Sequence, residues 1–213
     1  MIALRIQSPG LTELAAQAAA IGAGAELLRA AGDGVAVLLR KHFIGLEKTR
    51  PNRLGGARTH FYGKVQASVQ QPVVSGNAAD VSIDRVGIAQ RYFGGPIEAG
   101  HGISSKTGKP TEFLTVPARA ETHGKTAKAF PHLEFRPTRR GGMLVEMLRT
   151  VSRITRAGRR RVSIVGGLVM FWLVRRLVQK PDPTVLPTDA DLLQAAETSA
   201  AGWLQRRLEE GPK

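Results

Sequence analysis

The residues in this sequence best suited to chemistry are arginines, and they gather in one stretch of the chain. From Arg136 to Arg176 there are eleven arginines and one acidic residue, Glu146, which gives a net charge of +10 over 41 residues. A guanidinium group binds carboxylate or phosphate through two parallel hydrogen bonds and is weakly hydrated, so it suits interfaces. Three interpretations stay open: a solvated segment that keeps the protein soluble, a contact with an acidic neighbouring subunit, and a contact with DNA phosphates.

The densest part of this stretch, residues 149–161, is predicted to form a basic arm. Its centre is Ala157-Gly158, which is typical of a hairpin tip or a loop that reaches beyond a sheet. Few aromatic residues are interleaved, so stacking on nucleic-acid bases is poorly supported. The candidate contact residues of the arm are Arg149, Arg153, Arg156, Arg159, Arg160 and Arg161.

Little elsewhere in the sequence indicates catalysis or metal binding. The sequence has no cysteine, which excludes disulfides, thiolate metal sites and cysteine nucleophiles. The five histidines show no metal-ligand spacing, and the Gly/Ser/Lys-rich segment 100–110, expected to be a mobile loop, lacks the spacing of a phosphate-binding loop. We therefore expect a protein that is not an enzyme and that holds no cofactor and no metal. The histidines are His42, His60, His101, His123 and His132.

The composition leaves several classes of partner open. The 213 residues include 31 Lys and Arg against 17 Asp and Glu, a net charge of +14, which is compatible with nucleic acid, an anionic membrane surface or an acidic protein. The longest apolar run, Val162 to Val174, is too short for a membrane span. Pro9, Gly10 and Glu13 interrupt the Ala-rich N-terminal stretch, so we expect no signal peptide and a soluble protein.

The two ends of the chain are predicted to be helical. Apolar residues recur at three- and four-residue steps over 11–47, with Thr12 as a plausible cap. Gly32-Asp33-Gly34 interrupts this pattern, so the region is either one helix with a weak point or two helices. A second apolar stripe predicts a helix over 188–210, capped by Thr188 or Asp189.

The region between the helices is predicted to be mostly antiparallel β-sheet. Alternation from Val65 to Val73 and again from Ala79 to Ile83, on either side of a Ser-Gly-Asn turn, predicts a β-hairpin. Two helical turns over 86–93 are expected to stop at Gly94-Gly95-Pro96. Further short strands are expected around Ile97 and over 113–117, 133–135, 143–148, 162–165 and 168–174. The prediction is one α+β domain over 1–213, in which the N-terminal and C-terminal helices pack on an antiparallel sheet spanning 64–178, with long loops and the basic arm.

Two motifs resemble a known family. Residues 86–97 read V-G-I-A-Q-R-Y-F-G-G-P-I and, after a variable loop, residues 113–118 read F-L-T-V-P-A. This pattern is similar to that of tailed-phage virion-morphogenesis proteins, the tail-completion or head–tail joining proteins. The glycine pair permits a helix stop with a sharp reversal, and the proline ends a strand. The positions that carry the motif are Arg91, Tyr92, Gly94, Gly95 and Pro117.

Shorter fragments extend the resemblance to one branch of that family. These fragments are 50–56, 59–62, Gly124-Lys125 and Leu186-Pro187. Together with the two motifs they cover roughly 38–208 as spaced short matches. The 149–161 arm is longer and more basic than the family pattern, so the resemblance assigns it no role.

The resemblance implies a structural virion protein without enzymatic activity. It implies a homo-oligomeric ring, sixfold in preference to twelvefold, at the neck between the capsid portal and the tail tube, with DNA passing through the bore. The partners would be other copies of the chain, the adjacent neck or adaptor proteins, and the tail-tube or tail-terminator proteins, with no membrane. The protein would be made in the host cytoplasm and reside in the virion. The alternative is a basic nucleic-acid-binding domain that contacts DNA phosphates through its Arg-rich segment, and self-association without nucleic acid would separate the two.

Overall fold

The computed structural model describes residues 1–20, 22–51, 54–100, 111–147, 149–154, 160–165 and 167–210. Contacts within the chain group it into two compact units, a subdivision that the sequence analysis does not anticipate. Unit 1 comprises Met1–Arg50, His60–Gly95 and Lys180–Lys213, and unit 2 comprises Pro51–Thr59 and Pro96–Gln179. Unit 2 is therefore inserted into unit 1 along the chain.

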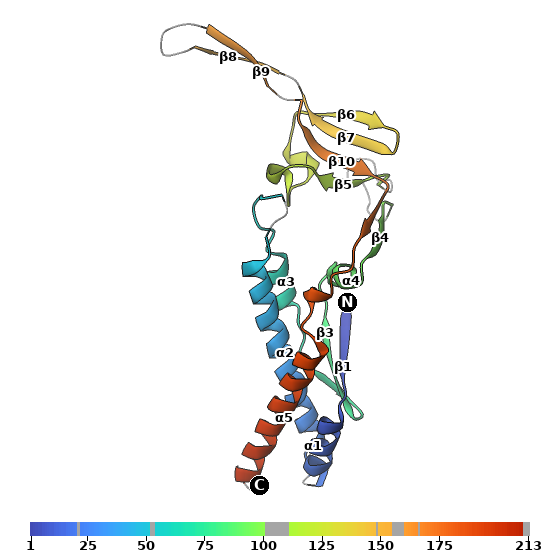
Figure 1. Cartoon of the computed structure of the whole chain (residues 1–213), viewed down its shortest axis with the longest axis vertical. Coiled ribbons are helices and arrows are strands. Elements are labelled where there is room, and N and C mark those ends of the chain that lie inside the picture. Colours follow the sequence, from blue (N-terminus) through green and yellow to red (C-terminus); the bar gives the residue numbers. More distant parts are fainter. Residues whose placement is uncertain are drawn as a thin grey trace. The chain divides into compact units, whose positions relative to one another are not determined.

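Unit 1 combines helices with a small antiparallel sheet (Figure 1). Its strands pair in the order β1-β3-β2, so the first strand of the chain lies beside the third. The strands are β1 (Ile2–Ile6), β2 (Val73–Ser75) and β3 (Ala78–Ile83). The helices are α1 (Pro9–Ala20), α2 (Gly24–Thr49), α3 (Phe61–Ala67), α4 (Ile88–Phe93) and α5 (Asp189–Glu210), with a 3₁₀ turn η3 (Pro183–Val185).

One long helix, α2, organises the core of unit 1. It buries eight residues along one face, and a stripe of five of them spaced four apart joins β3 and α5 in the same core. The stripe consists of Leu27, Ala31, Val35, Leu39 and Phe43. Helix α5 contributes Leu192, Ala196, Ala200 and Leu204 to the same core.

The glycines in α2 do not break the helix; they permit close packing. A Cβ atom on Gly32 would lie 2.4 Å from Pro72 Cβ, and one on Gly34 would lie 2.5 Å from Ser199 Cβ. Of the two arrangements that the sequence left open, the structure has one continuous helix over this stretch. The interruption comes earlier, between the end of α1 and the start of α2.

The helix caps are partly as expected. Thr188 Oγ1 accepts a hydrogen bond from Asp191 N at 3.2 Å, which confirms it as the cap of α5. The expected cap at Thr12 is wrong: Ser8 Oγ accepts from Leu11 N at 3.0 Å, so α1 begins one turn earlier. The reason is that Pro9 occupies the first helical position, where its missing N–H costs nothing.

The strand predicted from Val65 to Val73 is wrong over its first part, although Val73 begins β2. Residues 61–67 form α3, which buries Tyr62 and Val65 one turn apart, and Val69 makes only an isolated bridge with Ile83. Strand β1 was not predicted, although Ile2, Leu4 and Ile6 alternate with exposed residues. The β2–β3 hairpin and the two turns of α4 are confirmed.

Unit 2 is built from antiparallel strands (Figure 1). Its main sheet has the order β5-β10-β7-β6, and the buried ring of Phe171 packs edge-to-face on Phe130 with centroids 5.6 Å apart. The strands of this sheet are β5 (Leu114–Pro117), β6 (Leu133–Thr138), β7 (Gly141–Glu146) and β10 (Val169–Val174). Two further pairs are β4 (Gly95–Glu98) with β11 (Arg176–Gln179), and β8 (Arg149–Ile154) with β9 (Arg160–Val165). Two 3₁₀ turns, η1 (Ala120–Thr122) and η2 (Ala127–Ala129), complete the unit.

The α+β class, with antiparallel sheets and helices near both termini, is confirmed. The strands among the described residues form four sheets, and the long helices pack on the three-stranded sheet of unit 1. Within the described part of the chain, no helix is long and apolar enough to cross a membrane.

Candidate functional site

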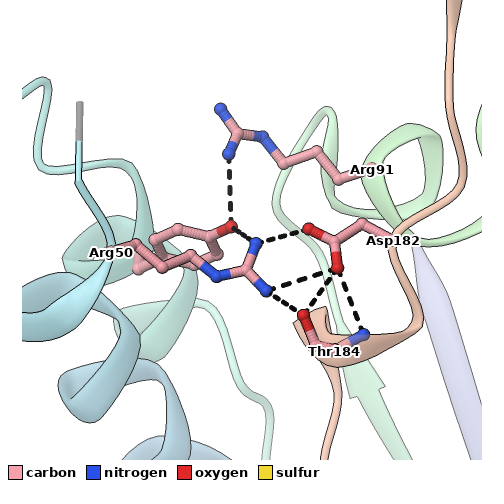
Figure 2. A network of polar contacts seen from close by, with 5 residues as sticks. Arg50, Arg91, Asp182 and Thr184 are labelled. Atoms are coloured by element: carbon pink, nitrogen blue, oxygen red, sulfur yellow. Dashed lines mark hydrogen bonds and ion pairs between the residues drawn. The ribbon is translucent and has the colours of Figure 1, made fainter. Parts of the chain in front are cut away.

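Residues from three of the motif-bearing segments meet Asp182 and Thr184 in a polar network in unit 1 (Figure 2). Arg50, the residue after α2, donates through Nη1 to Tyr62 Oη at 2.8 Å and to Asp182 Oδ2 at 2.5 Å. Its Nη2 also donates to Thr184 Oγ1. Thr184 N and Oγ1 both donate to Asp182 Oδ1, which fixes the carboxylate at the start of η3. The network joins chain segments that are up to 134 residues apart.

Arg91 of the family-like motif attaches α4 to the same network. Its guanidinium lies over the Phe61 ring at 4.1 Å from the centroid, and Nη1 donates to Tyr62 Oη at 3.2 Å. Asp182 N donates to Arg91 O at 3.0 Å, so the backbone is tied as well. In Figure 2 the other terminal nitrogen of Arg91 points away from the network. Arg91 therefore positions α4 against α3 and η3.

The ion pair within the network changes the protonation of its members. The hydrogen bonds from Arg50 and then from Thr184 lower the pKa of Asp182 below its usual range. Burial alone would lower the pKa of Arg50, but the hydrogen bond to Asp182 and the neighbouring charges outweigh it and raise that pKa. The network therefore stabilises unit 1 most when Asp182 is ionised.

The other motif positions serve the backbone and the core. Gly94 and Gly95 have φ of 69° and 109°, values that favour glycine, and together they end α4 and begin β4. Tyr92 packs against the core of unit 1 and meets the exposed Phe93 edge-to-face. Pro117, in unit 2, is the last residue of the edge strand β5, as expected.

The arm is a two-stranded hairpin. Strands β8 and β9 pair with each other and with no other strand that the structure describes. Their register places Arg153 opposite Arg161, and Arg149 and Arg160 lie at the strand ends. Arg156 and Arg159, like residues 101–110 of the predicted loop, lie outside the described residues. At its base, Gly167 N donates to Glu146 O and Glu146 N donates to Leu168 O, which holds the two ends of the hairpin together.

A second concentration of arginine lies at one end of the main sheet of unit 2. Arg139 and Arg140 form the two-residue turn between β6 and β7, and Arg175 and Arg176 follow β10. Because Val174 pairs with Gly141, the register brings these two arginine pairs to the same end of the sheet. All four side chains are exposed, and we call this group the arginine edge.

The two units differ sharply in charge. Unit 1 holds 13 Lys and Arg against 12 Asp and Glu, whereas unit 2 holds 18 against five. Nearly the whole net charge of the protein therefore belongs to unit 2. Every basic side chain that the structure describes in unit 2 is exposed.

The structure also bears on the residues that sequence reasoning set aside or missed. Among the described residues, no group of three His, Asp or Glu is placed to hold a metal ion. His42 is half-buried in α2, as expected for a polar residue at the rim of a core.

Arg50 and Asp182 were missed as partners, since nothing in their local sequence signals a contact across 132 residues. The arginine edge could have been found from the turn between the two predicted strands 133–135 and 143–148.

Comparison with known proteins identifies no relative: no family model, no curated protein and no solved structure matches this chain. The family resemblance drawn from short motifs stays a prediction.

Proposed function

We propose that this protein is a structural subunit of a tailed-phage virion, a tail-completion or head–tail joining protein. It assembles as a homo-oligomeric ring, sixfold in preference to twelvefold, at the neck between the portal and the tail tube. DNA passes through the bore of this ring. Its neighbours are adaptor proteins of the neck and the tail-tube or tail-terminator protein, and its role is assembly rather than catalysis. It is made in the host cytoplasm and ends in the virion.

One observation carries the proposal beyond the motif resemblance: the β8–β9 arm pairs only with itself among the described strands. An isolated two-stranded hairpin is marginally stable in water. A partner surface that covers the hairpin removes this cost.

A ring offers the arm such a surface on every subunit. Ring subunits contact one another head-to-tail, so each presents one surface forward and a different surface backward. The hairpin of one subunit and the surface that it contacts on the next subunit would be two such different surfaces. The same arm at the rim of the ring also reaches a neighbouring neck protein.

Excision of the arm tests this proposal. Residues 148–166 would be replaced by Asn-Gly, a favoured two-residue turn, because the hydrogen bonds between Glu146 and Gly167-Leu168 already hold the two ends together. In the phage that encodes the chain, we expect the excised protein to fold and heads and tails to accumulate unjoined in electron micrographs. A circular dichroism spectrum and a urea midpoint close to those of the intact protein are the controls. Normal numbers of infectious particles would contradict the proposal.

A second function is favoured by the charge of unit 2, which suits a nucleic-acid-binding domain that contacts phosphates through its arginines. The two candidates differ in self-association. A ring subunit associates with itself or with its neck partner when nucleic acid has been digested, whereas a simple DNA-binding domain does not.

A further inference from the structure

We propose that the arginine edge of unit 2, formed by Arg139, Arg140, Arg175 and Arg176, binds the phosphate backbone of duplex DNA without reading its base sequence. This surface is distinct from the β8–β9 arm. The inference rests on the proposed function in one respect, because the DNA would be the molecule that passes through the bore of the ring. The binding test itself does not depend on the proposed function.

The backbone of unit 2 fixes the position of the edge. Thr138 pairs with Gly141, so Arg139 and Arg140 are held in a tight two-residue turn. Val174 pairs with Gly141 from the other side, so Arg175 leaves β10 beside that turn. Ala99 N donates to Arg175 O at 2.9 Å, which holds this exit in place. The paired strands therefore hold the backbone of all four arginines at one end of the sheet.

The edge keeps an excess of positive charge after its local partners are considered. Arg176 Nε lies 3.6 Å from Glu98 Oε1, an exposed pair of the kind that contributes little. Glu112 lines the same surface hollow as Arg175 and Arg176, so two carboxylates stand against four arginines. Within the described residues, Arg139 and Arg140 make no ion pair. They are the pair most available to an external anion.

The charge balance of the whole chain favours a foreign polyanion over a second copy of the protein. Unit 1 has almost equal numbers of basic and acidic residues, and unit 2 has an excess of 13 basic residues. Neither unit of a neighbouring copy can neutralise such an excess. DNA carries one phosphate charge about every 1.7 Å along its axis and therefore can.

The chemistry of the edge suits the backbone rather than the bases. Arginine binds phosphate with two parallel hydrogen bonds, and such contacts position a protein on DNA without selecting sequence. The Arg175 guanidinium lies 5.7 Å from the centroid of the Phe113 ring, so this aromatic ring already has a cationic neighbour.

The test is a binding titration of the full chain with labelled duplexes of about 30 base pairs, roughly three helical turns, in two unrelated sequences. The edge variant would be R139Q/R140Q/R175Q/R176Q. The matched control would be R29Q/K41Q/K64Q/R206Q, which removes the same charge from four exposed side chains of unit 1. Each phosphate contact adds about 0.9 to the slope of log affinity against log salt, so we expect the edge variant to lose about three to four units of slope. Its affinity at low salt should fall at least about tenfold, and both duplex sequences should behave alike.

The inference is overturned if the edge variant keeps the affinity and slope of the natural protein, or if the control loses as much as the edge variant. A strong preference between the two duplexes would also overturn it. The arm-excised protein separates this test from the test of the proposed function. If the edge variant loses DNA binding while the arm-excised protein still joins heads to tails, only the proposed role of the arm is refuted. Failure of the edge variant to change DNA binding, with joining abolished by arm excision, refutes the edge alone.

Discussion

Arg50 shows how much of unit 1 can depend on a single side chain. It follows the last residue of α2 and contacts Tyr62 of α3 as well as Asp182 and Thr184 around η3. Resemblance to a family indicated Arg91 and Tyr92 as important positions, and Arg91 does join this network. The carboxylate that completes it could not be predicted, because local sequence carries no information about a contact across 132 residues.

We predict that Asp182→Asn destabilises unit 1 by about 1 kcal/mol at neutral pH, a value reduced for the partial exposure of the pair. The folded-state pKa of Asp182 is lowered, so its contribution is complete above the unfolded value near 3.8 and is lost as pH falls through the folded value. Urea unfolding should therefore separate the variant from the natural protein at about pH 6.5 and much less at about pH 3. Asp84→Asn, at an exposed position of the same unit, is the control. An equal gap at both pH values would rule out the ion pair as the cause.

At the scale of elements, Gly32 and Gly34 do not break α2, because both face close neighbours in the core of unit 1. The small residues at these positions let β3 and α5 approach α2 closely. This packing stabilises the helix, because glycine itself has a low helix propensity. Sequence patterns predicted the elements whose signals are local, such as the β2–β3 hairpin with its glycine turn and the Thr188 cap. They failed at α3, where valines spaced by four residues fit either a strand or a helix.

We predict opposite effects for two glycine-to-alanine changes in α2. In Gly34→Ala the new Cβ would lie 2.6 Å from Ala195 O, so overpacking should outweigh the gain in helix propensity and destabilise by about 1–3 kcal/mol. In Gly45→Ala the new Cβ meets nothing within 4 Å, so the same change should stabilise by up to about 1 kcal/mol. Urea denaturation of the two variants checks both signs. A stabilising Gly34→Ala would show that α2 and α5 are not so closely packed.

At the scale of the whole molecule, charge and fold are segregated. Unit 1 holds the helical core, the three-stranded sheet and a balanced charge, and unit 2 holds the other described sheets and nearly all of the excess basic charge. The net charge follows directly from the composition, and on that basis nucleic acid, an anionic membrane surface and an acidic protein stayed open as partners. The segregation of this charge between the two units could not be predicted from the composition, because the borders of an inserted unit depend on contacts between distant segments.

We predict that the purified, nuclease-treated protein associates into a discrete species, six times 22.9 kDa for a sixfold ring. Its mass by light scattering should persist at low and high salt. Mass that rises only when DNA is added, and falls again with salt, would instead favour the nucleic-acid-binding alternative. Addition of the neck partner is the control for assembly that requires a template.

The insertion of unit 2 within unit 1 also has a consequence for the order of events during synthesis. Four core residues of unit 1 lie in α5, the last of them Leu204. The strands of unit 2 pair only with neighbours that precede Lys180. A growing chain can therefore complete every strand pair of unit 2 while the core of unit 1 still lacks its closing helix. Until the ribosome releases that helix, the part of the α2 stripe that packs against α5 stays uncovered, which is the interval when a nascent chain of this topology most needs a chaperone.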